Sequence, residues 1–315
     1  MKSSQGIHID GVVPIIPTPF NGDEQIDCSS LRGLIEFAHA AGACAVCLPA
    51  YASEFYKLSE AERRLVVDEA VAASAGRVPV IGQVNYPSAR LAVEAAVYAQ
   101  RAGATAIAAA VPRLFSLSER DLLRYFDRLL TAIEIPLIIQ DFNPGGSTIG
   151  PDFIVSLHRV HPHFRYVKLE DPLMGSKIKS ILDATHGEVG VIEGWGGMYV
   201  MELVPVGISG IMPGLGLTDL LTRVFRLLRQ NQMDEAFRIF QGVLPQIVFS
   251  LQHMELFHPA EKMLLQARGI LSQIAVRDLR MELWESDRNY IVFLNNKVLE
   301  LLDQLNMPHN PAVSA

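Results

Sequence analysis

With 315 residues, the chain is long enough for one large α/β barrel or two smaller domains. Half of the residues are hydrophobic and the mean hydropathy is +0.23, so a large buried core can form, yet no apolar run reaches the roughly 18 residues of a membrane span. The net charge of −7 and the absence of a basic run argue against nucleic acid as a partner. The stretch MKSSQGIHIDG lacks the apolar centre of a signal peptide, which predicts a cytoplasmic protein.

Short apolar runs alternate with amphipathic stretches along most of the chain. The runs that we predict as strands are Gly11–Ile16, Ala45–Leu48, Val78–Val84, Thr105–Ala110, Pro136–Gln140, Tyr166–Leu169, Gly190–Glu193 and Ile208–Met212. The helical patterns that follow them are Ser29–Ala41, Ser59–Ala73, Ala89–Ala102, Glu119–Ile133, Pro151–Arg159, Gly175–Ala184, Met198–Val206 and Leu217–Arg229. A helix after each strand predicts an α/β protein whose parallel sheet closes into a (β/α)8 TIM barrel.

Beyond the eighth strand the pattern is helical only. The segments Met233–Leu251, Pro259–Arg268 and Val276–Leu305 all have helical periodicity, with no strand between them. We therefore predict a barrel over residues 8–230, a C-terminal helical extension over 231–306 and a loose tail over 307–315.

The sixth predicted strand, in FRYVKLEDP, carries the most informative lysine. Side chains alternate along a strand, so Tyr166, Lys168 and Glu170 share one face, while the apolar Val167 and Leu169 share the other. If the apolar pair faces the helices, Lys168 points into the barrel, where an amine has reason to lose its proton and attack carbonyl carbons. The alternative is a surface edge strand with a solvated Lys–Glu pair. A second lysine with apolar neighbours, Lys262, falls on a predicted helix outside the barrel.

Active sites of such barrels lie at the C-terminal ends of the strands, so the loops that follow the strands supply the other candidates. Tyr51 and Ser53 follow the second strand with Ala52 between them, and their hydroxyls and the N–H groups of the loop are candidates for binding substrate oxygens; Tyr51 is alternatively an interface residue. Glu54, next in this loop, is expected to be a structural hydrogen-bond acceptor. Alternation lets only one of Gln140 and Asp141 point inward, and we favour Gln140.

The loop after the seventh strand is rich in glycine. Gly194 and Gly196 allow close approach of a ligand to the backbone, and Trp195 between them is either a lid or part of the core. The pair Cys44 and Cys47 has CxxC spacing but no second pair or His cluster, so we predict buried strand cysteines with neither a metal nor a disulfide.

Several motifs together resemble a known superfamily. They are VVPIIPTPF, a Ser-Glu loop followed by LSEAER, a proline turn after the fifth strand and VK in the sixth. In this order they resemble the pyruvate-dependent lyases of the dihydrodipicolinate synthase and N-acetylneuraminate lyase superfamily, over about residues 10–270. The resemblance implies a Schiff-base lysine at Lys168, a small 2-keto acid substrate, a homotetramer, and no metal or organic cofactor.

Two departures from the motifs of the superfamily narrow the activity that the resemblance implies. Tyr51 and Ala52 stand where paired threonines relay protons in the superfamily, and Gln140 stands where a tyrosine is the usual proton shuttle. The Ser-Glu loop, the Gln-Asp pair and Lys-x-Glu are instead similar to the 2-keto-3-deoxy sugar acid dehydratases, such as those acting on L-2-keto-3-deoxyarabonate. Dehydration with Glu170 as base or acid is therefore the predicted reaction, and a structural ion pair of Glu170 with Lys168 or Arg165 is its alternative.

Other functions stay open at this stage. One is a pyruvate-dependent retro-aldolase or a condensation like that of dihydrodipicolinate synthase. Another is a catalytically inactive binding or regulatory homologue, although such a protein has no need of the amine of Lys168.

Overall fold

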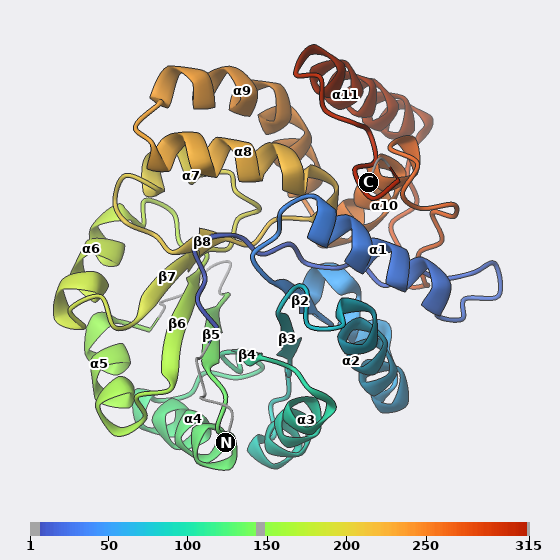
Figure 1. The fold of residues 1–315 in the computed structure, drawn as a ribbon. Coiled ribbons are helices and arrows are strands. Elements are labelled where there is room, and N and C mark those ends of the chain that lie inside the picture. Colours follow the sequence, from blue (N-terminus) through green and yellow to red (C-terminus); the bar gives the residue numbers. More distant parts are fainter. Residues whose placement is uncertain (1–6, 143–148, 314–315) are drawn as a thin grey trace.

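Eight parallel strands form one sheet at the centre of the molecule (Figure 1). The structure, a computed structural model, describes residues 7–142 and 149–313. The strands are β1 Gly11–Val12, β2 Val46–Leu48, β3 Val80–Gln83, β4 Ala106–Ala110, β5 Leu137–Asp141, β6 Phe164–Leu169, β7 Gly190–Glu193 and β8 Gly210–Ile211. Their order is β1-β8-β7-β6-β5-β4-β3-β2, and a parallel bridge from Ile15, which follows β1, to Cys47 in β2 joins the two ends of the sheet. The predicted (β/α)8 barrel is confirmed.

Helices surround the sheet on its outside. They are α1 Cys28–Ala40, α2 Glu60–Ser74, α3 Ala89–Ala102, α4 Glu119–Ala132, α5 Pro151–Val160, α6 Gly175–Ala184, α7 Val200–Leu203 and α8 Thr218–Arg229. Local sequence fixes several of their ends. Ser59 and Ser118 each open a helix in a capping box, with Glu62 and Asp121 as the reciprocal partners.

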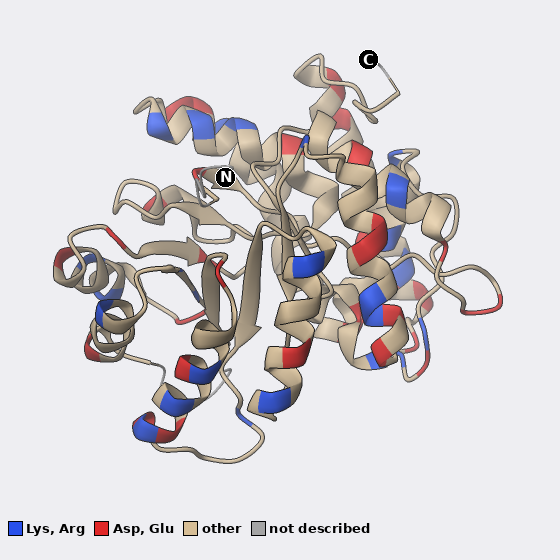
Figure 2. Ribbon diagram, turned by 60° about the horizontal axis from the view of Figure 1, so that its bottom comes forward, with Lys and Arg blue, Asp and Glu red and all other residues tan. Residues whose placement is uncertain are grey.

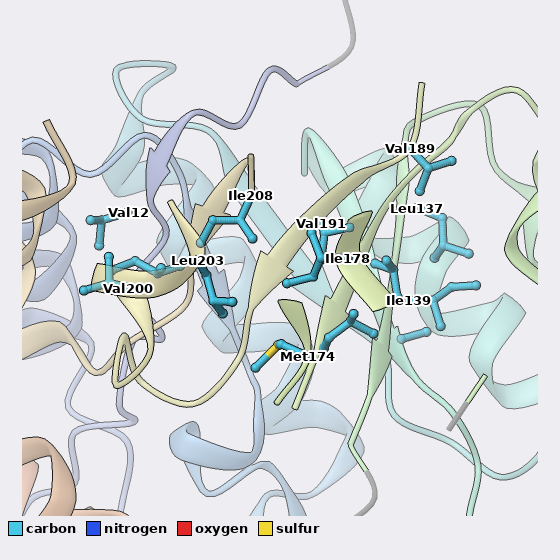
Figure 3. Packing of buried hydrophobic residues seen from close by; sticks show 14 of the residues in the cluster. Val12, Leu137, Ile139, Met174, Ile178, Val189, Val191, Val200, Leu203 and Ile208 are labelled. Atoms are coloured by element: carbon cyan, nitrogen blue, oxygen red, sulfur yellow. The ribbon is translucent and has the colours of Figure 1, made fainter. Parts of the chain in front are cut away.

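Apolar side chains fill both sides of the strands. Residues such as Ile81, Ile138 and Ile192 belong to a cluster inside the barrel. Their neighbours on the opposite face, among them Ile139 and Val191, belong to a larger cluster toward the helices (Figure 3). Because both faces are covered, the strand sequences are almost wholly apolar, and a polar side chain on the inner face is exceptional.

The C-terminal third is helical, as predicted, but two helix bounds differ. α9 Met233–Ser250 packs on α8, whereas α10 runs from Met254 to Ala267 and α11 from Glu285 to Gln304 (Figure 1). α10 thus begins before the proline that we expected near its start, because the turn from Met254 already forms on a cap by His253. The segment between α10 and α11, which we predicted as helical from Val276, is not helical. Arg277 in this segment donates hydrogen bonds to the backbone carbonyls of Glu24 and Lys57. The division of the chain into a barrel up to residue 230, a helical extension up to residue 306 and a loose tail stays a prediction.

Charged residues of both signs are interspersed over the outer helices and loops (Figure 2). Among residues 7–142 and 149–313, no helix combines the length and the apolar character that crossing a membrane requires.

Candidate active site

Strand β6 presents its side chains as the alternation predicts. Tyr166 belongs to the cluster inside the barrel, and its hydroxyl accepts the N–H of Ile9 at 3.0 Å. Val167 and Leu169 belong to the cluster toward the helices. Lys168, between them, therefore points inward, with 7% of its surface exposed.

Lys168 forms an ion pair with Glu170. Its Nζ lies 2.9 Å from Oε1 of Glu170, and Glu170 is itself only 6% exposed. Gln140 pairs with Lys168 in the register of β5 and β6, and its Nε2 donates to the same Oε1 at 2.9 Å. The other carboxylate oxygen, Oε2, is buried and has no partner among the described residues. One oxygen of Glu170 is thus held by two donors, while the second is available to a bound molecule.

A chain of carboxamides fixes the orientation of Gln140. The backbone N–H of Ala110 donates to Oδ1 of Asn85 at 2.9 Å, so this oxygen is an acceptor. The amide nitrogen of Gln83 donates to the same oxygen at 3.2 Å and to Oε1 of Gln140 at 2.5 Å. The amide nitrogen of Gln140 must then face Glu170. A backbone N–H in β4 therefore determines which end of Gln140 meets the carboxylate.

Sequence reasoning missed Gln83. Its signal was present, because Gln83 is polar within the otherwise apolar strand β3 and lies two residues from the inward-facing Ile81. Cys47 also contacts this amide, with Sγ 3.4 Å from Oε1 of Gln83. Burial raises the pKa of the Cys47 thiol to about 12, so it is held as a neutral thiol. Cys28, Cys44 and Cys47 are all free.

A pocket of about 560 Å³, including the space at its mouth, opens above this group at the C-terminal ends of the strands. The predicted site residues that line it are Lys168, Glu170, Gln140, Tyr51, Ala52, Gly194, Trp195 and Gly196. Burial, and after it the charge of Glu170, raises the pKa of the Tyr51 hydroxyl. Trp195 lines the pocket and also packs on the large cluster, so it is part of the core, and a role as a lid stays a prediction.

Ser53 does not reach the pocket. It is fully buried, and its hydroxyl donates to the carbonyl of Ile16 at 2.6 Å. The 3-10 turn Tyr51–Ser53, labelled η1, turns this side chain toward the barrel wall, a rotation that a loop sequence does not reveal. We therefore no longer propose its hydroxyl as a substrate ligand.

Glu54 and Lys262 form a separate buried pair. Oε1 of Glu54 accepts from Nζ of Lys262 at 2.6 Å, and both residues are 1% exposed. Burial lowers the pKa of Lys262, and the charge of Glu54 opposes that shift. The prediction that Glu54 is a structural acceptor is confirmed, and neither residue lines the pocket with Lys168.

Asp141 faces away from the pocket, as the alternation predicts. It is fully buried, forms ion pairs with Arg113 and Lys177, and accepts the N–H of Ile149 at 2.8 Å. Burial raises the pKa of Asp141. Gln140 is thus the member of this pair that points inward.

The glycine loop rests on a buried carboxyl. Oε2 of Glu193 accepts the N–H of Gly197 at 2.8 Å, while its Oε1 has no partner among the described residues. Burial raises the pKa of Glu193 to about 7. Gly194 next to it packs against the reactive pair, since a Cβ there would lie 2.6 Å from Oε1 of Glu170 and 2.8 Å from Cε of Lys168.

An α/β barrel with a buried lysine–carboxylate pair under a pocket at the C-terminal ends of its strands has the layout of an enzyme for small molecules. In the described part of the chain, no group of three or more His, Cys, Asp or Glu side chains converges to hold a metal ion. The chain matches the dihydrodipicolinate synthetase family over residues 8–278, and it belongs to that family.

Several relatives place the chain within this family. L-2-keto-3-deoxyarabonate dehydratase of Azospirillum brasilense is 27% identical over 257 residues, which are 78% of this chain and 81% of the relative. 4-Hydroxy-tetrahydrodipicolinate synthase of Methanopyrus kandleri is 32% identical over 243 residues, or 76% and 81% of the two chains. The crystal structure of dihydrodipicolinate synthase from Rhodopseudomonas palustris superimposes with a TM-score of 0.85 at 25% identity, covering 92% of this chain and 97% of the other.

YagE of Escherichia coli K12, whose crystal structure contains pyruvate, shares the fold with a TM-score of 0.83 at 20% identity, over 93% of this chain and 98% of the other. The class of this chain is therefore that of the Schiff-base lyases and aldolases of the family.

Proposed function

We propose that this chain is a Schiff-base hydro-lyase that removes water from a 2-keto-3-deoxy acid with a hydroxyl at C4. The observation that carries the proposal is the arrangement of Glu170. Its Oε1 is held by Lys168 and Gln140, each at 2.9 Å, while its Oε2 is free of partners in the described chain. The similarity to the dehydratase of Azospirillum brasilense supports this reaction and suggests 2-keto-3-deoxy sugar acids as the class of substrate.

The reaction begins at the amine of Lys168. Lys168 passes a proton to the carboxylate of Glu170, and the neutral amine attacks C2 of the keto acid. Glu170 returns this proton to the C2 oxygen, which leaves as water, so that an iminium remains that can take up electrons from C3. Glu170 then removes a proton from C3 and gives an enamine. The same carboxyl, now protonated, delivers the proton to the hydroxyl leaving C4, so that a second water departs. Hydrolysis of the resulting unsaturated iminium frees Lys168 and releases the unsaturated 2-keto acid.

The substrate carboxylate is expected at the turn η1. The N–H groups of Tyr51 and Ala52 open this turn and have no acceptor inside it. Both residues line the pocket together with Lys168. Their backbone donors are therefore suited to a carboxylate next to the C2 carbon that Lys168 attacks.

Cleavage of the C3–C4 bond is the competing reaction. An aldolase needs a group that accepts the proton of the C4 hydroxyl, and a carboxamide such as Gln140 cannot accept a proton near neutral pH. Tyr51 also lines the pocket, but its raised pKa disfavours the phenolate that would accept this proton. Dehydration uses the carboxyl of Glu170 first as base and then as acid, and the similarity to the dehydratase of Azospirillum brasilense favours this reaction over the aldolase.

Two measurements test this proposal. Incubation with pyruvate and borohydride should add mass to the peptide that contains Lys168, and the Lys168→Met variant should stay unlabelled. A label on Lys262, or no label at all, would overturn the Schiff base. Turnover of 2-keto-3-deoxy acids followed by NMR should then show water loss, whereas pyruvate and an aldehyde among the products would assign the chain to the aldolases.

We also propose that the protein is a homotetramer, as its resemblance to the superfamily implies. Light scattering should give four times the 34.7 kDa mass of the chain. A stable monomer at that mass would contradict the proposal.

A further inference from the structure

We propose that the substrate carries an apolar group beyond C4, aliphatic or aromatic, in place of the polyol end of a sugar acid. The inference rests on the proposed function for the reaction at C2 to C4, and it replaces the sugar acids that the similarity to the Azospirillum brasilense enzyme suggests by acids with an apolar end. Its basis is the apolar part of the pocket wall, which is formed by Phe142, Trp195, Leu251, Met254 and Phe257.

This wall, which we call the distal wall, is built from separate parts of the chain. Phe142 directly follows β5, and Trp195 lies in the loop after β7. Leu251 follows α9 as its C-cap, while Met254 and Phe257 lie in the first turn of α10. The helical extension thus reaches over the barrel mouth and contributes three apolar side chains to the same pocket as Lys168.

The charged and amide side chains of the pocket form one group around Glu170. Lys168, Glu170 and Gln140 bond to one another around the reacting carbons. Tyr51 packs its ring on Phe142, with ring centroids 5.3 Å apart, and so extends the apolar surface. Among the described residues that line the pocket there is no Arg, Asp, Asn, His, Ser or Thr side chain.

These contents favour one kind of ligand. A hydroxyl that leaves water for an apolar wall without a hydrogen-bond partner loses binding energy, whereas a methylene or a ring gains it. The indole N–H of Trp195 is one donor in the distal wall, and it can serve at most one oxygen of a polyol. Apolar side chains that line an open pocket are also covered best by an apolar ligand.

A pair of substrates that differ in a single group tests the inference. The acid 4-hydroxy-2-ketohexanoate has a methyl where 4,5-dihydroxy-2-ketopentanoate has a hydroxyl, and the two have nearly the same shape. One such change in a hydrophobic pocket alters kcat/KM by roughly 10–200-fold. We expect the wild-type protein to prefer the methyl compound by at least roughly tenfold, and to accept a phenyl group at C4 as well.

Two variants test whether the distal wall causes the preference for the methyl compound, and each changes the first residue of a helix. Met254 opens α10 in the distal wall, and Met233 opens α9 outside the pocket, where it is 45% exposed. Met254→Gln, which conserves the volume of the side chain, should lower the preference for the methyl compound about fivefold or more. Met233→Gln is the matched control and should leave the preference unchanged.

Pyruvate separates this inference from the proposed function, because it has no carbon beyond C3 and does not reach the distal wall. Labelling of Lys168 by pyruvate and borohydride, together with an equal or greater rate for the dihydroxy acid, would overturn the inference and leave the Schiff-base mechanism intact. An unchanged preference in Met254→Gln would also overturn it. Failure of pyruvate to label Lys168 would instead overturn the proposed function.

Discussion

Gly194 offers the sharpest test of how the reactive pair is positioned. A methyl group at this position would lie 2.6 Å from Oε1 of Glu170 and 2.8 Å from Cε of Lys168, where ordinary contacts are 3.4–4 Å. The two side chains would have to give way by about 1 Å, and a displacement of that size can cost about 100-fold in rate. We therefore expect Gly194→Ala to lower kcat/KM for dehydration about 100-fold, which corresponds to about 2.7 kcal/mol of transition-state stabilisation.

The matched control is Gly33→Ala. Gly33 lies within α1, and a Cβ there meets nothing within 4 Å. This substitution should stabilise the fold by about 0.4–1 kcal/mol and leave the kinetics unchanged. Kinetics, borohydride labelling by pyruvate and thermal unfolding should be measured for both variants. If Gly194→Ala keeps the wild-type kcat/KM and the wild-type melting temperature, Lys168 and Glu170 do not react from the positions described here.

Three other predictions concern the groups around this pair. Glu170→Gln should lose about 10²–10⁴-fold in turnover while its Lys168 is still labelled by substrate and borohydride, and full activity would remove Glu170 from the mechanism. Gln83→Met should lower turnover at least roughly tenfold, because it releases the amide of Gln140 from its hydrogen bond. Gln246→Met changes another buried glutamine, on α9, and should leave turnover unchanged. Equal rates in the two variants would show that the chain of carboxamides has no role. Glu193 should contribute a fall in the free energy of unfolding as the pH rises from about 4.5 to about 7, because the folded protein keeps the proton of Glu193 to a higher pH than the unfolded chain does. Glu193→Gln should make the free energy of unfolding change less steeply with pH. Urea titrations at several pH values measure this dependence, and the same steepness as in the wild type would contradict the role given to Glu193.

Much of the fold and part of the site could be predicted because they depend on short-range patterns. Strand periodicity correctly turned Lys168 inward with Glu170 beside it. The same alternation chose Gln140 over Asp141, and the capping box at Ser59 marked the start of a helix. Each of these features involves residues within a few positions of one another.

Features that depend on distant parts of the chain could not be predicted. Gln83 and Gln140 are 57 residues apart, and their hydrogen bond arises only from the register of three neighbouring strands. The rotation that turns Ser53 toward Ile16 depends on a 3-10 turn for which the sequence has no periodic signal. The predicted start of α10 at Pro259 was wrong, because the helix begins at Met254 on a cap by His253 and the proline lies inside it.

The position of α10 has a consequence for how such enzymes can diverge. Lys168, Glu170 and Gln140 are contributed by the central strands, whereas Met254 and Phe257 are contributed by a helix that follows the last of them. Under the inference above, three of the five residues that select the substrate, Leu251, Met254 and Phe257, therefore lie outside the strands that carry the reactive pair. Substitutions at Met254 or Phe257, which leave the buried pair of Lys262 with Glu54 in place, can therefore change the substrate while the catalytic residues are inherited unchanged.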